Sequence, residues 1–399
     1  MPGLMNEYIS KRFGAVELES ELLKLISAYN KERDSYLLVY STAIGKPIPE
    51  VSLIQADYFL IHDLLKDKNR NAKVDVYIET PGGSGETAEE IVRFLHDNFE
   101  TVSFVISGEA KSAGTIIALS GDEIIMSETG SLGPIDAQMK IGRSVISAYD
   151  YMEWVEGKRK EAGEQGRLNP FDATMVAQIT PGELGSVFHA LKFAEDLVVD
   201  WLIRYKFKNW TVTKTRGIPV TDDMKRNRAQ EIAAELTNHS KWRSHGRSIK
   251  RGDLDDIGLE ITKLEGNPKL SDIVYRIQTV CRMLFNVTNT FKIFATADGK
   301  IFKSAMPAGM PLGLPLGLPV STMQKPDIAQ AEVNCPQCGA KHRMYAKFSP
   351  QSRIDKDLQR QGFTPFPKDA KLKCKCGFVI DLSGLKNQLE IQTEKKIIT

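Results

Sequence analysis

Two short motifs supply residues that could carry out acyl transfer. The first is Thr-Pro-Gly-Gly at positions 80–83, which follows the alternating apolar residues of 74–79. The second is Lys-Ser-Ala-Gly at positions 111–114, a turn of small residues with a hydroxyl at its apex. A paired-glycine turn can direct backbone N–H groups at one point, and a serine at a strand-to-helix turn can reach that point. The two motifs therefore predict a serine nucleophile and an oxyanion hole.

The elements around these motifs alternate between strand and helix patterns. Short apolar runs predict strands at 36–40, 74–79, 101–106 and 123–126, and helical spacing predicts helices at 50–66 and 87–96. This alternation, with short turns, indicates an α/β fold built on a parallel sheet with right-handed crossovers. Further helices are expected at 14–32, 143–166, from Pro181 onward, at 226–237 and at 270–284.

Several motifs then occur in a defined order: 80–83, Ser112 to Thr115, Asp122 to Met126, and Leu132 to Asp136. In this order they resemble the serine dehydrogenase proteinase family, a branch of the Clp protease/crotonase superfamily related to signal peptide peptidase A. The resemblance covers about residues 36–262. It implies a Clp protease/crotonase-like ββα spiral fold. It also implies that Ser112 is the nucleophile and that the backbone N–H groups of Gly83 and Ala113 form the oxyanion hole.

The general base is the least defined part of this site. A serine hydroxyl is a weak nucleophile without a proton acceptor. Clp proteases place a histidine shortly after the strand that follows the serine, but this chain has none between His96 and His189. A triad of that kind is therefore not expected. Signal peptide peptidase A and its relatives use a Ser-Lys dyad, so the resemblance implies a lysine whose pKa is lowered by burial.

The candidates for this lysine are Lys140, Lys158, Lys160 and Lys192. Lys158 lies in a charged run, 156–161, that equally describes a solvated helix face. Lys192 lies at the edge of an apolar helical stripe, where it could instead extend its ammonium to solvent. The sequence does not separate Lys158 from Lys192. Lys111, beside the nucleophile, is expected to point away from it, because neighbours in an extended segment face opposite sides.

His245 is the remaining candidate base. It precedes an Asp-Asp-Ile-Gly-Leu segment, 255–259, that resembles the closing Gly-Leu region of the family. Alternatively, this histidine could cap an element or lie at the edge of the hydrophobic core. Asp136 could orient whichever base is used, or it could cap a turn.

Four cysteines form two short pairs near the C-terminus: Cys335, Cys338, Cys374 and Cys376. Four thiolates from two tight turns predict a closed tetrahedral site for structural Zn²⁺, and hence a small zinc ribbon. Because Cys-x-Cys is a less common spacing than Cys-x-x-Cys, His342 could replace one ligand. A thiol cluster without metal would leave a module of this size with too small a core to fold.

Composition is that of a soluble globular protein: 399 residues, 42% apolar and 26% charged, with a net charge of +2. A net charge this small does not attract the whole protein to nucleic acid or to a membrane surface. Residues 331–399 are basic, however, with 13 Lys/Arg against 7 Asp/Glu, whereas the remainder has 40 against 44. Residues 1–12 lack the apolar core expected of a signal peptide, and the sequence holds no uninterrupted apolar run of about 18 residues that would span a bilayer. With its clustered cysteines, the chain is expected in a reducing compartment, the cytoplasm.

The expected domains are an N-terminal helical arm at 1–35, the peptidase domain at 36–303, a Pro/Gly-rich linker at 304–330, the zinc ribbon at 331–383 and a tail at 384–399. Superfamily relatives assemble as trimers or larger rings, so the resemblance implies a homo-oligomer. The basic ribbon carries aromatic residues and could contact nucleic acid, an acidic protein or a substrate. Those aromatics could equally fill its small core.

These features together predict an ATP-independent serine peptidase acting on a protein or peptide, with the zinc ribbon recruiting a partner or substrate. No Walker-type nucleotide loop is present, and the glycines at 82–85 do not have dinucleotide-binding spacing. The alternatives are a crotonase-type acyl-CoA enzyme and a catalytically inactive binding scaffold. The sequence does not indicate the substrate, the cleavage preference or an activating signal.

Overall fold

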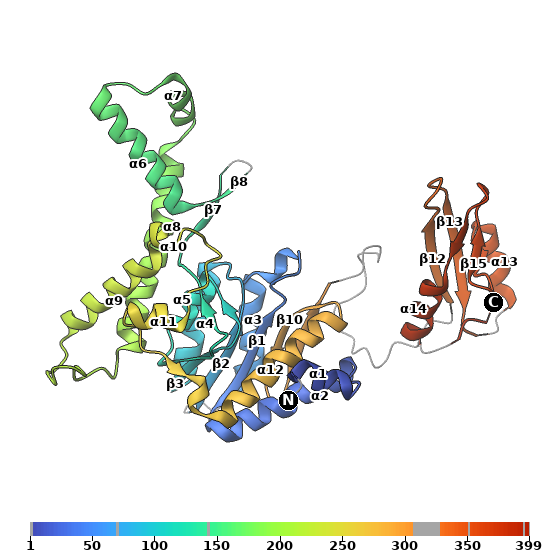
Figure 1. Cartoon of the computed structure of the whole chain (residues 1–399), viewed down its shortest axis with the longest axis horizontal. Helices are drawn as coiled ribbons and strands as arrows, with labels where there is room; N and C mark the ends of the chain where they lie inside the picture. The colour runs from blue at the N-terminus through green and yellow to red at the C-terminus, as the bar shows by residue number, and fades with distance from the viewer. Residues whose placement is uncertain are drawn as a thin grey trace. The chain divides into compact units, whose positions relative to one another are not determined.

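The computed structural model describes residues 3–68, 72–141, 144–305, 328–349, 352–393 and 396–398. The chain divides into two compact units, Met1–Ala308 and Gly309–Thr399, which are described separately (Figure 1). The predicted peptidase domain and zinc ribbon fall in different units. Most of the predicted linker, residues 306–327, lies outside the described residues. The finer domain boundaries stay predictions.

The centre of the first unit is a seven-stranded sheet. Its strands are β1 (Tyr36–Thr42), β2 (Lys73–Glu79), β3 (Thr101–Ile106), β5 (Glu123–Met126), β9 (Thr262–Lys263), β10 (Thr290–Ala295) and β11 (Lys300–Ser304). Their order is β11-β10-β1-β2-β3-β5-β9. Strands β1, β2, β3, β5 and β9 are parallel, whereas β10 and β11 extend the sheet antiparallel beyond β1. The α/β fold class is confirmed, with two antiparallel strands in addition to the predicted ones.

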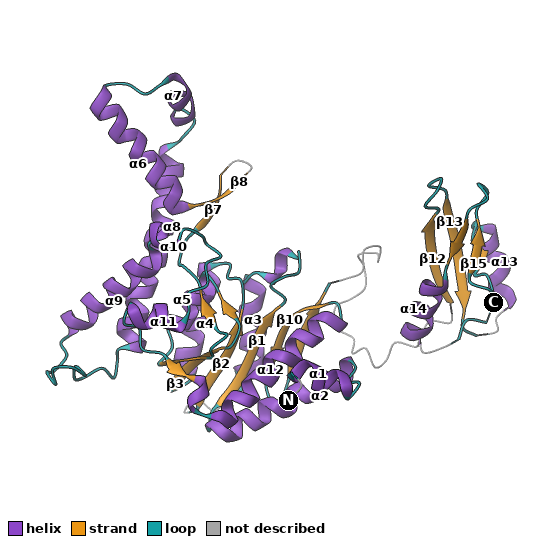
Figure 2. Cartoon of the chain, viewed as in Figure 1, coloured by secondary structure: helices purple, strands orange, loops and turns teal. Residues whose placement is uncertain are grey.

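Helices cover both faces of this sheet (Figure 2). One face packs against α3 (Gln55–Leu65), α4 (Gly85–Asn98) and α5 (Ala113–Leu119), and the other against α1 (Leu4–Ser10), α2 (Ala15–Arg33) and α12 (Pro268–Val287). In β1, Leu38 faces the first core and Leu37 the second. Because both faces are buried, the strand reads as a continuous apolar run instead of alternating with polar residues.

The predicted helix at 143–166 begins later than expected. Residues before it form a hairpin of β7 (Gln138–Ile141) and β8 (Ser144–Ser147), and α6 spans Ala148–Gln165. Ser147 sets this boundary, because its hydroxyl accepts a hydrogen bond from the Asp150 N–H at 3.2 Å and caps the helix. Two short strands near the predicted site, β4 (Glu109–Ala110) and β6 (Ser131–Leu132), pair in parallel.

The remaining elements of the first unit are largely helical. They are α7 (Pro170–Val176), α8 (Pro181–Trp201), a short π-helix at Leu202–Lys206, α9 (Asp222–Thr237), α10 (His239–Trp242), α11 (Arg251–Asp256) and 3₁₀ helices at Pro49–Val51 and Leu264–Gly266. Figure 1 shows α6 and α7 extending away from the sheet of this unit. In the described parts of the chain, no helix combines the length and apolarity needed to cross a bilayer.

The second unit consists of β12 (Ile328–Asn334), β13 (Lys341–Lys347), α13 (Ser352–Arg360), β14 (Thr364–Pro365), β15 (Lys371–Lys373), β16 (Val379–Asp381) and α14 (Ser383–Thr393). The sheet β12-β13-β14 and the hairpin β15-β16 enclose a small core. The expected tail at 384–399 instead begins with α14. This helix forms because Leu385 and Leu389, one turn apart, pack against that core.

A buried ion pair connects the sheet to the segment before α3. Lys292 on β10 and Asp57 on α3 are both fully buried, and their side chains bond to each other. The Lys292 ammonium also donates to the Ser52 carbonyl at 2.8 Å, and Asp57 accepts from the Ile54 N–H at 3.1 Å. Burial lowers the pKa of Lys292, whereas Asp57 acts in the opposite direction. The pair therefore fixes residues 52–57, and Leu53 of this segment forms backbone hydrogen bonds with the glycine turn.

We expect Asp57→Ala to destabilise the first unit by about 3–5 kcal/mol, because it leaves the buried Lys292 ammonium without its counter-ion. Chemical denaturation followed by tryptophan fluorescence measures the change. Asp63→Ala is the matched control, since Asp63 is an exposed carboxylate of the same helix paired with Lys66. Equal stability of the two variants would contradict the role given to the buried pair.

Candidate active site

The glycine turn after β2 requires glycine at two positions. Gly82 and Gly83 have φ angles of +97° and +148°, which residues with a side chain rarely adopt. A Cβ on Gly83 would lie 2.4–2.9 Å from backbone atoms of Leu53. Leu53 donates its N–H to the Gly82 carbonyl at 2.7 Å and accepts from the Ser84 N–H at 3.0 Å. Within the described residues no acceptor is recorded for the Gly83 N–H, which is therefore available to a ligand.

Ser112 occupies a strained position between β4 and α5. Its φ and ψ are 51° and −118°, a conformation that costs free energy for a residue other than glycine. Although Ser112 is the N-cap of α5, its side chain makes no capping hydrogen bond. The hydroxyl is therefore not used to complete the helix. The Ala113 N–H, at the start of α5, also has no recorded acceptor among the described residues.

The two turns are brought together by backbone hydrogen bonds. Thr80 donates its N–H to the Glu109 carbonyl at 2.8 Å, and Lys111 donates its N–H to the Thr80 carbonyl at 3.0 Å. As a result Ser112, Gly83 and Ala113 line one cavity of about 490 Å³. The apolar part of its wall consists of Ile116, Ile135, Ala190, Phe193 and Ala194.

The same cavity is lined by His245 and Asp136. His245 Nδ1 lies 3.6 Å from Asp136 Oδ2, slightly beyond hydrogen-bonding distance. Asp136 is buried and accepts hydrogen bonds from Gln138 Nε2 at 2.7 Å and Ser147 Oγ at 2.8 Å. The β7–β8 hairpin thus holds the carboxylate in place. A serine, a histidine and a carboxylate from distant segments meet here.

The lysine candidates lie elsewhere, and neither Lys158 nor Lys192 lines this cavity. Lys158 on α6 bonds to Asp172 at 2.7 Å and to Glu161 at 2.9 Å, and these bonds raise its pKa. Lys192 on α8 is half exposed, and its bonds to Asp196 and Glu195 likewise raise its pKa. A lysine base requires the opposite shift.

Two further lysines complete this comparison. Lys160 is an exposed side chain of α6 that lies 3.9 Å from Glu164. The side chain of Lys140 lies outside the described residues.

Two features of the cavity were not found by sequence reasoning. One is the support of Asp136 by Gln138 and Ser147, because the β7–β8 hairpin carried no recognisable strand signal. The other is the contribution of α8 to the wall through Phe193. Phe193 falls on a long amphipathic helix, and its sequence position gives no sign that it faces a cavity instead of the core.

The four C-terminal cysteines also converge. The Sγ atoms of Cys335, Cys338, Cys374 and Cys376 all lie within 4.8 Å of one another. Two of the sulfur–sulfur distances are 3.7 and 3.6 Å, close to the edge of about 3.8 Å that a tetrahedral site with Zn–S bonds of about 2.3 Å would have. His342 Nε2 lies 3.2 Å from Cys374 Sγ, so it contacts one of the four sulfur atoms from outside the cluster.

Comparison with protein families gives one match: residues 44–164 match the model described as ClpP-like SDH-type serine proteinase. Over these residues the match agrees with the family that the motifs resemble. Two uncharacterized proteins of Methanocaldococcus jannaschii are 38% identical over 80 residues and 37% identical over 70 residues. These segments are 19% and 18% of this chain and 27% and 24% of those proteins. The chain therefore spans about a quarter of the length of these relatives.

Two further comparisons have wider coverage of this chain. A protein named Na(+)/H(+) antiporter NhaA from Brucella abortus is 31% identical over 144 residues, 34% of this chain and 18% of that protein. Two solved structures of the 1510-N membrane-bound stomatin-specific protease, both variants and one with a substrate peptide, are 12% and 13% identical. They cover 56% and 55% of this chain and 79% and 76% of theirs, each with a TM-score of 0.33.

Proposed function

Because residues 44–164 match the model of the ClpP-like SDH-type serine proteinases, we propose that this protein is an ATP-independent serine peptidase. Ser112 is the nucleophile, His245 the general base and Asp136 the residue that orients it. The N–H groups of Gly83 and Ala113 form the oxyanion hole. One observation carries the proposal: a single cavity is lined by all five residues, which come from four separate segments.

The proposed reaction follows from these roles. His245 takes the proton of the Ser112 hydroxyl as its oxygen attacks the carbonyl carbon of the scissile peptide bond. The Gly83 and Ala113 N–H groups donate to the oxygen that becomes negatively charged. His245 then gives the proton to the leaving amine, and the C–N bond breaks to leave an acyl-enzyme. A water molecule activated by the same histidine hydrolyses the ester and restores Ser112.

His245 is preferred to a lysine base for two reasons. It lines the cavity, and a buried carboxylate 3.6 Å away can fix its tautomer once the contact tightens on substrate binding. Lys158 and Lys192, in contrast, are paired with two carboxylates each, which stabilises the protonated form that cannot act as a base. The Ser-Lys dyad implied by the resemblance is therefore the competing assignment.

The cavity wall suggests the kind of peptide that would bind. Ile116, Ile135 and Phe193 present apolar surface beside the nucleophile, and Ala190 and Ala194 leave space between them. An apolar side chain next to the cleaved bond would bury its surface there, which favours binding by about 25 cal/mol per Å². Apolar residues at the cleavage site are the proposed preference.

The second unit is proposed as a zinc ribbon that recruits a partner or substrate. The donor set of four thiols fits structural Zn²⁺, which would hold the β12–β13 and β15–β16 turns together through Cys335, Cys338, Cys374 and Cys376. The basic excess of residues 331–399 would suit an acidic protein or a nucleic acid. Reduced thiolates of this kind fit a cytoplasmic location.

A homo-oligomer is also proposed, assembled through the helices α7 and α8. Phe171, Phe188 and Met175 on these helices are 73%, 55% and 43% exposed, which is unusual for large apolar residues so close along one segment. A second copy of the chain would cover them.

The catalytic assignment predicts a graded loss of labelling by a fluorophosphonate probe. Ser112→Ala should abolish labelling, because the nucleophile is removed. His245→Ala should lower the second-order rate by about 10²–10⁴-fold, the usual contribution of a general base. Lys158→Met and Lys192→Met are matched controls and should keep the wild-type rate.

Other outcomes would separate the alternatives. A wild-type rate for His245→Ala together with a loss in either lysine variant would support the Ser-Lys dyad. Labelling that persists in Ser112→Ala would contradict the peptidase assignment and reopen the crotonase-type and scaffold alternatives.

The metal assignment predicts one Zn²⁺ per chain, measured by elemental analysis of the purified protein. Cys338→Ser should lose the metal, because it removes one of four ligands. Cys281→Ser is the control, since Cys281 is buried in the first unit outside the cluster. Ser112 labelling should be unchanged in Cys338→Ser, because the first unit alone forms the cavity. A full zinc content in Cys338→Ser would contradict the proposed ligand set.

The assembly proposal predicts that Phe171→Asp combined with Phe188→Asp reduces the oligomer to a smaller species in analytical ultracentrifugation. Lys160→Asp, an exposed change on α6, serves as the control. A wild-type protein that sediments as a monomer would refute the proposal.

A further inference from the structure

Lys111, the residue before the proposed nucleophile, is 5% exposed and makes three hydrogen bonds through its ammonium group. Nζ donates to the Leu132 carbonyl at 3.1 Å, the Arg247 carbonyl at 3.1 Å and Ser248 Oγ at 2.9 Å. A lysine ammonium has three N–H donors, so all of them are used. The side chain is therefore fixed in one orientation.

The two segments that Lys111 contacts are the ones that carry the other members of the proposed triad. Leu132 lies four residues before Asp136, and Arg247 lies two residues after His245. These segments also pair directly, because Leu132 and Ile249 exchange backbone hydrogen bonds of 2.9 and 3.1 Å. Lys111 thus joins the paired segments of the base and its carboxylate to the turn that bears Ser112.

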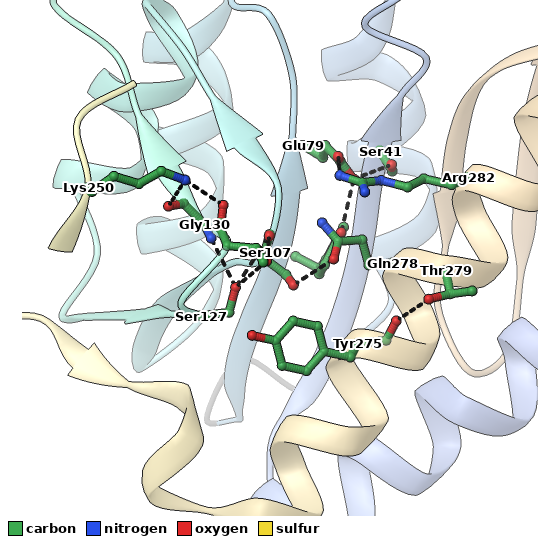
Figure 3. A network of polar contacts seen from close by, with 12 residues as sticks. Ser41, Glu79, Ser107, Ser127, Gly130, Lys250, Tyr275, Gln278, Thr279 and Arg282 are labelled. Atoms are coloured by element: carbon green, nitrogen blue, oxygen red, sulfur yellow. Dashed lines mark hydrogen bonds and ion pairs between the residues drawn. The ribbon is translucent and has the colours of Figure 1, made fainter. Parts of the chain in front are cut away.

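A neighbouring lysine makes a similar contact farther from the nucleophile. Lys250 Nζ donates to the Gly130 carbonyl at 3.1 Å and the Thr129 carbonyl at 2.8 Å. Figure 3 shows Lys250 reaching Gly130, beside the polar contacts of Ser107 and Ser127. Lys250 is exposed and forms no hydrogen bond with residues 111–113 among the described residues, although its charge acts to lower the pKa of Lys111. Lys250 therefore serves as the control residue for substitutions of Lys111.

The residues around Lys111 leave space for its side chain. A Cβ on Gly133 would lie 2.7 Å from Lys111 Cδ and 3.2 Å from its Cα, so glycine leaves the space that the lysine occupies. Burial lowers the pKa of Lys111. Among the described residues Lys111 forms no ion pair, and the three oxygens it bonds are two backbone carbonyls and a hydroxyl. The nearby Glu109 carboxylate acts in the opposite direction to burial and raises this pKa. Burying an amine in this way is unfavourable for folding alone.

From this arrangement we propose that Lys111 is a positioning residue, which holds His245 and Asp136 at the correct place relative to Ser112. The inference rests on the proposed function, because it requires His245 to be the base. A base must be within hydrogen-bonding reach of the proton it takes. A displacement of about 1 Å can lower the rate by about 10²-fold, so fixing the segment at 247–248 affects catalysis directly.

The test uses Lys111→Met in the full-length protein, because methionine keeps most of the length of the side chain and removes all three donors. We expect the rate of labelling by the fluorophosphonate probe to fall by about 10²-fold, in the maximal rate of inactivation and not in the probe's half-saturating concentration. Lys250→Met makes the same change at the neighbouring lysine and should keep the rate within about threefold of wild type.

A double-variant cycle separates positioning from a general loss of structure. When His245→Ala is already present, Lys111→Met should lower the rate by less than about threefold more, because a missing base cannot be misplaced. If Lys111→Met fails to fold, Ser248→Ala carries the test. It removes one of the three acceptors and should give a smaller loss that likewise disappears in the His245→Ala background.

Two results would overturn the inference while leaving the proposed base intact. One is a wild-type rate for Lys111→Met, and the other is the same fold-loss with and without His245. A wild-type rate for His245→Ala alone would instead overturn the proposed base, and this inference with it.

Discussion

Two backbone hydrogen bonds between the glycine turn and the serine turn are the constraint on which the candidate site depends. They join Thr80 to Glu109 and Lys111, and so place the N–H of Gly83 beside Ser112. Such bonds are possible because β2 and β3 are adjacent parallel strands, whose C-terminal ends meet at one edge of the sheet. Any change that separates these strands would separate Ser112 from the N–H group of Gly83.

The rest of the first unit keeps this arrangement fixed. The buried Lys292–Asp57 pair holds residues 52–57, and Leu53 in turn bonds to both sides of the glycine turn. On the other side, Lys111 connects the serine turn to the segment of His245. Strain at Ser112, with its positive φ, is thus balanced by contacts on both sides. The glycine turn and the serine turn are therefore held by hydrogen bonds without a substrate, as the proposed stabilisation of an oxyanion requires.

Sequence reasoning could name the candidate residues of this site, including His245 and Asp136, but not which of them lie close together. The glycine turn and Ser112 could be predicted because strand periodicity and the conformational freedom of glycine are encoded within a few residues. The cysteine cluster was predicted for the same reason, because its spacing is local. The proximity of His245 to Asp136 depends on the pairing of Leu132 with Ile249, which no local pattern encodes. The family resemblance favoured lysines instead. Most of their carboxylate partners lie three or four residues farther along the same helix, as helical spacing allows, whereas Asp172 reaches Lys158 from another helix.

The central claim is that Ser112 lies with the backbone N–H groups of Gly83 and Ala113 and with His245 in one cavity. A crystal structure of the fluorophosphonate-labelled protein tests it most directly. The account predicts phosphorus bonded to Ser112 Oγ, the phosphonyl oxygen hydrogen-bonded to the N–H groups of Gly83 and Ala113, and the His245 ring next to Oγ. A phosphonyl oxygen directed to solvent, with a lysine ammonium in place of His245, would contradict it.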